Sequence, residues 1–142
     1  MSSKPSNSTT PSTLPSSVLS SINIIATGRI LLGVGVLVAP QPLLGAFGLS
    51  LPADLILIAR LAGIRDVVLG ALLWTARTND PTPLGRSDVR RALTAGVMVD
   101  TADSMATLYA LATGNYDLKN TLTFIAGAVP FIGLGIFGLS SL

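Results

Sequence analysis

Four apolar stretches, each close to the length that crosses a lipid bilayer, alternate with short polar segments along this chain. About 20 residues of helix cover the hydrocarbon core of a membrane. We therefore predict helical spans over about 18–39, 52–76, 90–111 and 119–140. Gly and Pro lie between the stretches and favour turns there. The predicted fold class is all-α, a four-helix transmembrane bundle formed by residues 18–142.

The segments outside the spans are polar or short. Residues 1–17 are rich in Ser, Thr and Pro and lack apolar periodicity, so we predict a disordered tail. The segment 43–49 is apolar and short, and we expect a turn or an amphipathic piece at the membrane surface. The segment 77–91 is the most charged part of the chain, and its Pro, Gly and Asp residues predict a loop.

Charged side chains within the predicted spans are the most informative feature of the sequence. Each costs about 2.5–3.5 kcal/mol on membrane-insertion scales, so each needs a partner or a purpose. They are Arg29, Arg60, Arg65, Asp66, Asp100 and Asp103. Equal numbers of positive and negative charges favour ion pairs, for which arginine is well suited. We expect Arg29 to pair with Asp66, and Arg65 with Asp100 or Asp103.

The third span places its polar residues on one side. At about 100° per residue, one stripe holds Asp100, Asp103, Ser104 and Thr107. A stripe that faces other helices allows a charged span to exist in lipid. Either the carboxylates only hold the bundle together, or one of them is available in an apolar cavity as a general acid or base. Tyr109, one to two turns beyond Asp103, is a candidate hydrogen-bond donor to a ligand.

The second span differs, because its charges point in separate directions. Taking Arg60 as zero, Arg65 lies near 140° and Asp66 near 240° around the helix. One partner cannot meet all three side chains. We therefore expect protein on most sides of this helix, within the bundle or in a homo-oligomer.

The amino-acid composition excludes several kinds of catalytic and metal-binding site. The chain is 49% hydrophobic and 11% charged, and it contains neither Cys nor His. Disulfides, thiolate nucleophiles, His-based catalytic triads and the usual zinc sites are thereby excluded, and we expect no metal and no cofactor. A net charge of +2 without a long basic run argues against nucleic acid as a partner. Four arginines within 77–91 predict that this segment and both termini face the cytosol.

The R-x-x-G-x-R-D pattern from Arg60 to Asp66, together with the D-x-x-D pattern of Asp100 and Asp103, resembles a known family. Its members are small four-helix integral membrane proteins, mostly fungal, of unknown function. The resemblance covers about 20–139. It implies a place in a natural-product pathway, because similar small proteins are encoded in biosynthetic clusters for secondary metabolites. It also implies the endoplasmic reticulum as the membrane.

Three functions follow as alternatives. The first is conversion of a lipophilic small molecule by redox-neutral cyclisation or isomerisation, or assistance to a membrane-bound oxygenase. Asp100 and Asp103 are then the catalytic candidates. The remaining polar-core or ligand-binding candidates are Arg29, Arg60, Arg65, Asp66, Ser104 and Tyr109. The second function is a non-catalytic structural or assembly role, docking a membrane-bound biosynthetic enzyme. The third is a small transporter, for which four spans are few.

Overall fold

The computed structural model describes residues 16–49, 52–78 and 83–142, and the regular structure in these ranges is entirely helical. In chain order the elements are α1 (Ser16–Val38), α2 (Pro40–Ala46), the 3-10 turn η1 (Ala53–Leu55), α3 (Ile56–Thr78), α4 (Pro83–Ala112) and α5 (Leu118–Ser140). The all-α prediction is confirmed. The predicted disordered tail, 1–17, lies outside the described residues except for its last two, which begin α1.

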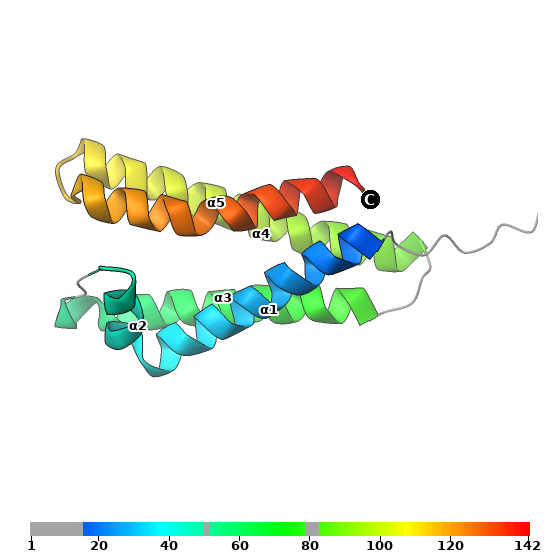
Figure 1. Cartoon of the computed structure of the whole chain (residues 1–142), viewed down its shortest axis with the longest axis horizontal. Helices are drawn as coiled ribbons and strands as arrows, with labels where there is room; N and C mark the ends of the chain where they lie inside the picture. Colours follow the sequence, from blue (N-terminus) through cyan, green and yellow to red (C-terminus); the bar gives the residue numbers. More distant parts are fainter. Residues whose placement is uncertain (1–15, 50–51, 79–82) are drawn as a thin grey trace, which may run out of the picture.

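The four long helices form two antiparallel pairs. α1 crosses α3, and α4 lies beside α5 (Figure 1). The pairs meet along α1–α5 and α3–α4, and they lie closest at the end where α1 begins and α5 ends. Toward α2 the two pairs separate (Figure 1). The short helix α2 overlaps the segment 43–49, for which the sequence predicts a turn or an amphipathic piece, and begins three residues earlier.

Glycine allows α1 and α3 to approach at backbone distance. A Cβ atom on Gly33 would lie 2.6 Å from the carbonyl oxygen of Gly63, and one on Gly70 would lie 2.8 Å from the carbonyl oxygen of Ala26. Both distances are shorter than any real contact. Small residues at such a crossing are typical of helix pairs in membranes. This crossing fixes the axial register of α1 on α3, and therefore which α3 residue each α1 side chain lies beside.

The buried apolar core fills one half of the bundle. α1 contributes Val18, Ile22, Ile25 and Ala26, and the other long helices contribute Leu73, Ala76, Val89 and Leu93. All of these residues lie nearer than the charged residues of the spans to the end where α1 begins. In the other half, long apolar side chains such as Leu57, Leu61 and Met105 are exposed.

α4 begins earlier than the sequence predicts. The sequence predicts a loop over 77–91 and a span from about 90, whereas α4 is helical from Pro83. Proline is well suited to the first position of a helix, where its missing N–H costs nothing. Val89 and Leu93 are buried four residues apart, so the inward face of α4 begins before its continuous apolar stretch. Residues 79–82 lie outside the described part of the loop.

Two of the described helices, α1 and α5, are long and apolar enough to cross a bilayer. α3 and α4 equal or exceed them in length, but their charged residues lower the mean hydropathy. The four predicted spans therefore correspond to four long helices, of which two, α1 and α5, are apolar enough to cross a bilayer.

Candidate functional site

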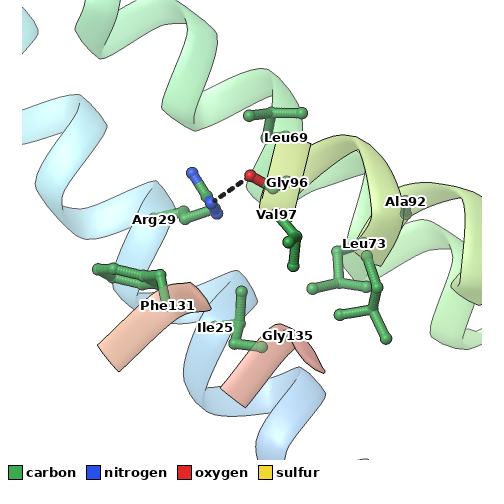
Figure 2. A pocket seen from close by; sticks show the side chains of 10 residues that line it. Ile25, Arg29, Leu69, Leu73, Ala92, Gly96, Val97, Phe131 and Gly135 are labelled. Atoms are coloured by element: carbon green, nitrogen blue, oxygen red, sulfur yellow. Dashed lines mark hydrogen bonds between the residues drawn. The ribbon is translucent and has the colours of Figure 1, made fainter. Parts of the chain in front are cut away.

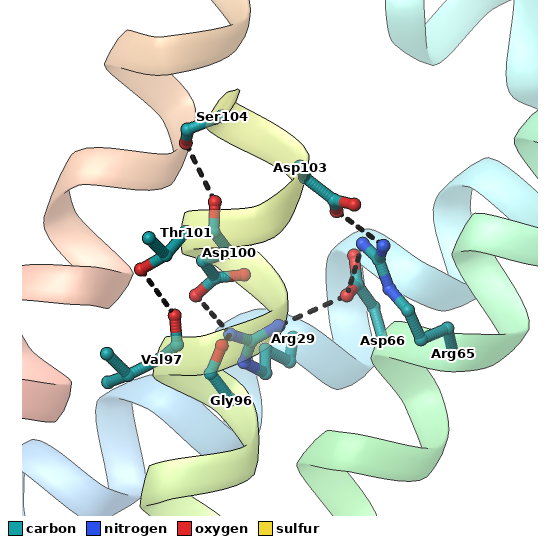
Figure 3. A network of polar contacts seen from close by, with 9 residues as sticks. All are labelled: Arg29, Arg65, Asp66, Gly96, Val97, Asp100, Thr101, Asp103 and Ser104. Carbon is teal, nitrogen blue, oxygen red and sulfur yellow. Dashed lines mark hydrogen bonds and ion pairs between the residues drawn. The ribbon is translucent and has the colours of Figure 1, made fainter. Parts of the chain in front are cut away.

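Arg29 of α1 is the centre of an ion network that joins three helices. Its guanidinium donates to Asp66 Oδ1 of α3 at 3.1 Å and to Asp100 Oδ2 of α4 (Figure 3). A longer contact of 3.5 Å runs to the carbonyl oxygen of Gly96. Gly96 has no side chain, and this lets the guanidinium approach the α4 backbone. The predicted Arg29–Asp66 pair is confirmed, and Asp100 is its additional partner.

Arg65 of α3 forms the second half of the network. It donates to Asp103 Oδ2 of α4, and its other terminal nitrogen lies 3.3 Å from Asp66 Oδ1. Of the two partners predicted for Arg65, the structure selects Asp103. Asp66 is shared between both arginines and links the two halves (Figure 3). The Nε–H of Arg65 is buried and has no hydrogen-bond partner among the described residues.

The two halves differ in access. The side chains of Arg29 and Asp100 are 5% and 9% exposed, whereas those of Arg65 and Asp103 are 35% and 31% exposed. A molecule arriving from outside the bundle therefore meets Arg65 and Asp103 first. Arg29 and Asp100 are closed off by the packed half of the bundle.

The network holds two guanidinium groups and three carboxyl groups. The sequence predicts balanced charges because it counts Arg60 among them. In the structure Arg60 lies exposed on α3, and no ion pair joins it to any described residue. The network itself therefore carries one more acidic than basic group. The described residues also contain no metal-binding group of His, Cys, Asp or Glu.

Ser104 lies beside the network without joining it, and Tyr109 lies farther along α4. The Ser104 hydroxyl donates to the carbonyl oxygen of Asp100 at 2.7 Å, within its own helix. Thr107 does the same with Asp103 at 2.8 Å. These bonds satisfy polar groups along the α4 stripe. Tyr109 is 71% exposed, near the end of α4.

A small pocket adjoins the buried half of the network. Arg29 and Phe131 lie on one side of it, and Gly96, Val97 and Gly135 on others (Figure 2). The Phe131 ring centre is 5.2 Å from the guanidinium carbon of Arg29, a distance suited to a cation–π contact. The free space suits about one water molecule. This pocket is too small for an organic substrate.

Two contacts of the network were not predicted from the sequence. The Gly96 carbonyl and the Phe131 ring both touch Arg29, and neither residue type signals such a role by itself. Glycine four residues before Asp100 is the one available clue, since it leaves room for a guanidinium on the same helix face.

No protein-family model, curated protein or solved structure matches this chain. The resemblance to the family of small four-helix membrane proteins stays a prediction.

Proposed function

We propose that this chain is a four-span membrane protein that converts, or assists in converting, a lipophilic small molecule. The first support is the outward face of the bundle. Large apolar side chains are exposed on each long helix, among them Leu31, Leu57, Met98 and Leu122. Soluble monomers rarely expose apolar surface on this scale, whereas lipid requires it. Endoplasmic reticulum and a natural-product pathway are parts of this proposal that rest on the family resemblance alone.

Helix lengths support a position of the network at mid-membrane. At 1.5 Å per residue, about 15 Å of α3 separates Ile56 from Asp66, and about 16 Å separates Asp66 from Arg77. The hydrocarbon core is about 30 Å thick. Trp74 at one end and Tyr116 at the other then lie near the headgroups, where aromatic residues are enriched. Burial raises the pKa of the Tyr116 phenol, and the neighbouring Asp117 carboxylate adds to this.

The excess carboxyl group carries the chemical proposal. At mid-membrane, an unpaired charge is costly and ionisable groups tend to neutralise instead. Three carboxyl groups facing two guanidinium groups are neutral as a set when they hold one proton. A general acid or base requires a proton that it can donate and accept again.

Access favours Asp103 as the proton-transfer group. It is half-buried and lies on the side where the helix pairs separate, whereas Asp100 is closed off. Arg65, paired with Asp103, can stabilise negative charge that develops on a substrate oxygen. We propose redox-neutral cyclisation or isomerisation, with Asp103 as acid or base and Asp100 as a positioning residue that holds Arg29.

The test replaces single carboxylates in the native host and profiles its lipophilic metabolites against a gene deletion. Asp103→Asn should abolish the metabolite that the deletion removes, at normal protein level and membrane insertion. Asp88→Asn, the same change on the exposed surface of α4, should leave it unchanged. Full product with Asp103→Asn would remove the catalytic proposal.

A structural or assembly role is the second candidate, and one observation favours it. Every carboxylate of the network already has an arginine partner, and the network ties the α1–α3 pair to α4. In that case Asp103→Asn keeps the product, and the protein co-purifies with a membrane-bound biosynthetic enzyme such as an oxygenase. Purification from the native membrane separates the two candidates.

A further inference from the structure

Arginines gather at the end of the bundle farthest from α2. Arg77 lies in the last turn of α3, and Arg86, Arg90 and Arg91 lie in the first turns of α4. These two ends come together where α1 begins (Figure 1). Arg90 and Arg91 are exposed. One carboxylate, that of Asp88, is exposed on the same turns. Because it offsets only one of the four arginines, the cluster keeps an excess of positive charge.

The packing of α4 against α5 shows that the α4 arginines lie beyond the end of α5 along the bundle axis. A Cβ atom on Gly138 would lie 3.0 Å from Leu93, and Gly135 lies against Val97. The end of α5 is therefore level with Leu93, and the preceding turns of α4 extend past it. α4 has 30 residues, or about 45 Å of helix, against a hydrocarbon core of about 30 Å. The α4 arginines consequently lie at headgroup level.

Arg77 is held in place at the same level. Its guanidinium donates to the side-chain oxygen of Asn23 on α1 and lies 4.2 Å from the ring centre of Trp74. An arginine fixed by two neighbours loses less conformational freedom when it binds an anion. Trp74 itself is part-exposed and suited to the boundary between headgroups and acyl chains.

We propose that Arg77, Arg86, Arg90 and Arg91 form a binding surface for anionic phospholipid headgroups. Arginine presents a planar fork of donors that matches phosphate oxygens. Clusters of basic residues directly beside a span attract anionic lipid at about 1 kcal/mol each, which is about fivefold in affinity. The proposal rests on the membrane placement above and is independent of chemistry at Asp103.

Trp74, the only tryptophan in the chain, reports directly on this surface. The protein is reconstituted in phosphatidylcholine bilayers in which either phosphatidylcholine or phosphatidylglycerol carries brominated acyl chains. Bromine quenches tryptophan on contact, so the two quenching curves give the relative affinity of Trp74's surroundings for the two lipids. Low salt strengthens the expected preference, because it lengthens the screening distance.

We expect phosphatidylglycerol to quench more strongly, and the preference to fall about 30-fold in the double variant Arg90→Gln/Arg91→Gln. Both side chains are exposed, so the variant should fold as the parent does. Lys119→Gln, which removes one positive charge at the start of α5, should leave the preference unchanged.

Three results would overturn the proposal. Equal quenching by both lipids in the parent protein means that the bilayer is contacted without headgroup selection. A fall of about fivefold in Lys119→Gln, the full effect of one charge, means that net charge alone decides. Loss of the preference for phosphatidylglycerol when inorganic phosphate is added means that a free anion, and not a lipid, fills the surface. Absence of quenching by either lipid instead contradicts the membrane placement.

Discussion

Arg29→Met is the most informative single substitution in the network. Arg29 contacts Asp66 at 3.1 Å and also binds Asp100, and the residue is 4% exposed. Methionine replaces the long side chain with an unbranched apolar one and removes only the guanidinium. Both carboxylates then lose this partner, but Asp66 keeps Arg65. Asp100 is left as a buried charge without an ion pair among the described residues.

The magnitude follows from that orphaned carboxylate. Removing one partner of a buried ion pair costs about 3–5 kcal/mol, because the remaining charge stays desolvated. Loss of the contact with Phe131 adds up to about 2 kcal/mol, because Arg29 is desolvated. We expect the free energy of unfolding to fall by about 5 kcal/mol. Adding Asp100→Asn removes the orphaned charge and should recover at least half of this loss.

The assay is equilibrium unfolding in mixed micelles, followed by Trp74 fluorescence as the proportion of denaturing detergent rises. Arg60→Met is the matched control, because Arg60 is an exposed arginine on α3. Exposed substitutions usually change stability by no more than about 0.5 kcal/mol. A loss below about 1 kcal/mol for Arg29→Met, or no recovery in the double variant, would show that Arg29 does not offset the buried charge of Asp100.

Other predictions test the packing around the network. Gly33→Leu should lower the free energy of unfolding by about 3 kcal/mol or more, because its side chain meets the α3 backbone. Cysteines at Val97 and Gly135 should form a disulfide on oxidation, since their Cβ atoms would lie 4.0 Å apart, and mass spectrometry after proteolysis detects it. Exchanging the charges of Arg65 and Asp103 should partly restore protein that each single change loses, as measured by immunoblot of membranes.

Gly127→Leu, at a glycine with open space around it, should be tolerated, so equal damage at Gly33 and Gly127 would argue against the α1–α3 crossing. A free thiol at Val97 after oxidation would contradict the height of α5 against α4. No rescue by the exchanged pair would argue against direct contact of Arg65 and Asp103.

The sequence predicts the ion pairs in part, because charges in apolar helices must find partners. This reasoning gives Arg29 with Asp66 and brings Arg65 to the α4 stripe. It does not predict the ion pair between Arg29 and Asp100. Helical periodicity gives the direction of a side chain around its axis, but the height of one helix against another is set by packing. Here the glycine crossing of α1 and α3 sets that height.

The same limit explains two other differences. Arg60 belongs to an apolar stretch by sequence, yet it lies in the second turn of α3 and faces outward. Near a helix end, a long side chain can reach the headgroups by extending along the helix. The start of α4 was missed because polar residues before Ala92 hide the inward positions of Val89 and Leu93. The first turns of α4 are amphipathic, so a search for continuous apolar stretches does not detect them.

Spin labels on α3 and on the turn η1 before it show whether α3 crosses a membrane with the network at its middle. Single cysteines at Leu55, Ile64, Val68 and Thr75, all exposed, carry the labels in a chain without native cysteine. We predict that oxygen accessibility is highest and nickel-chelate accessibility lowest at Ile64 and Val68, with the reverse at Leu55 and Thr75. High nickel-chelate accessibility at all four positions would place α3 in water and exclude a membrane span there.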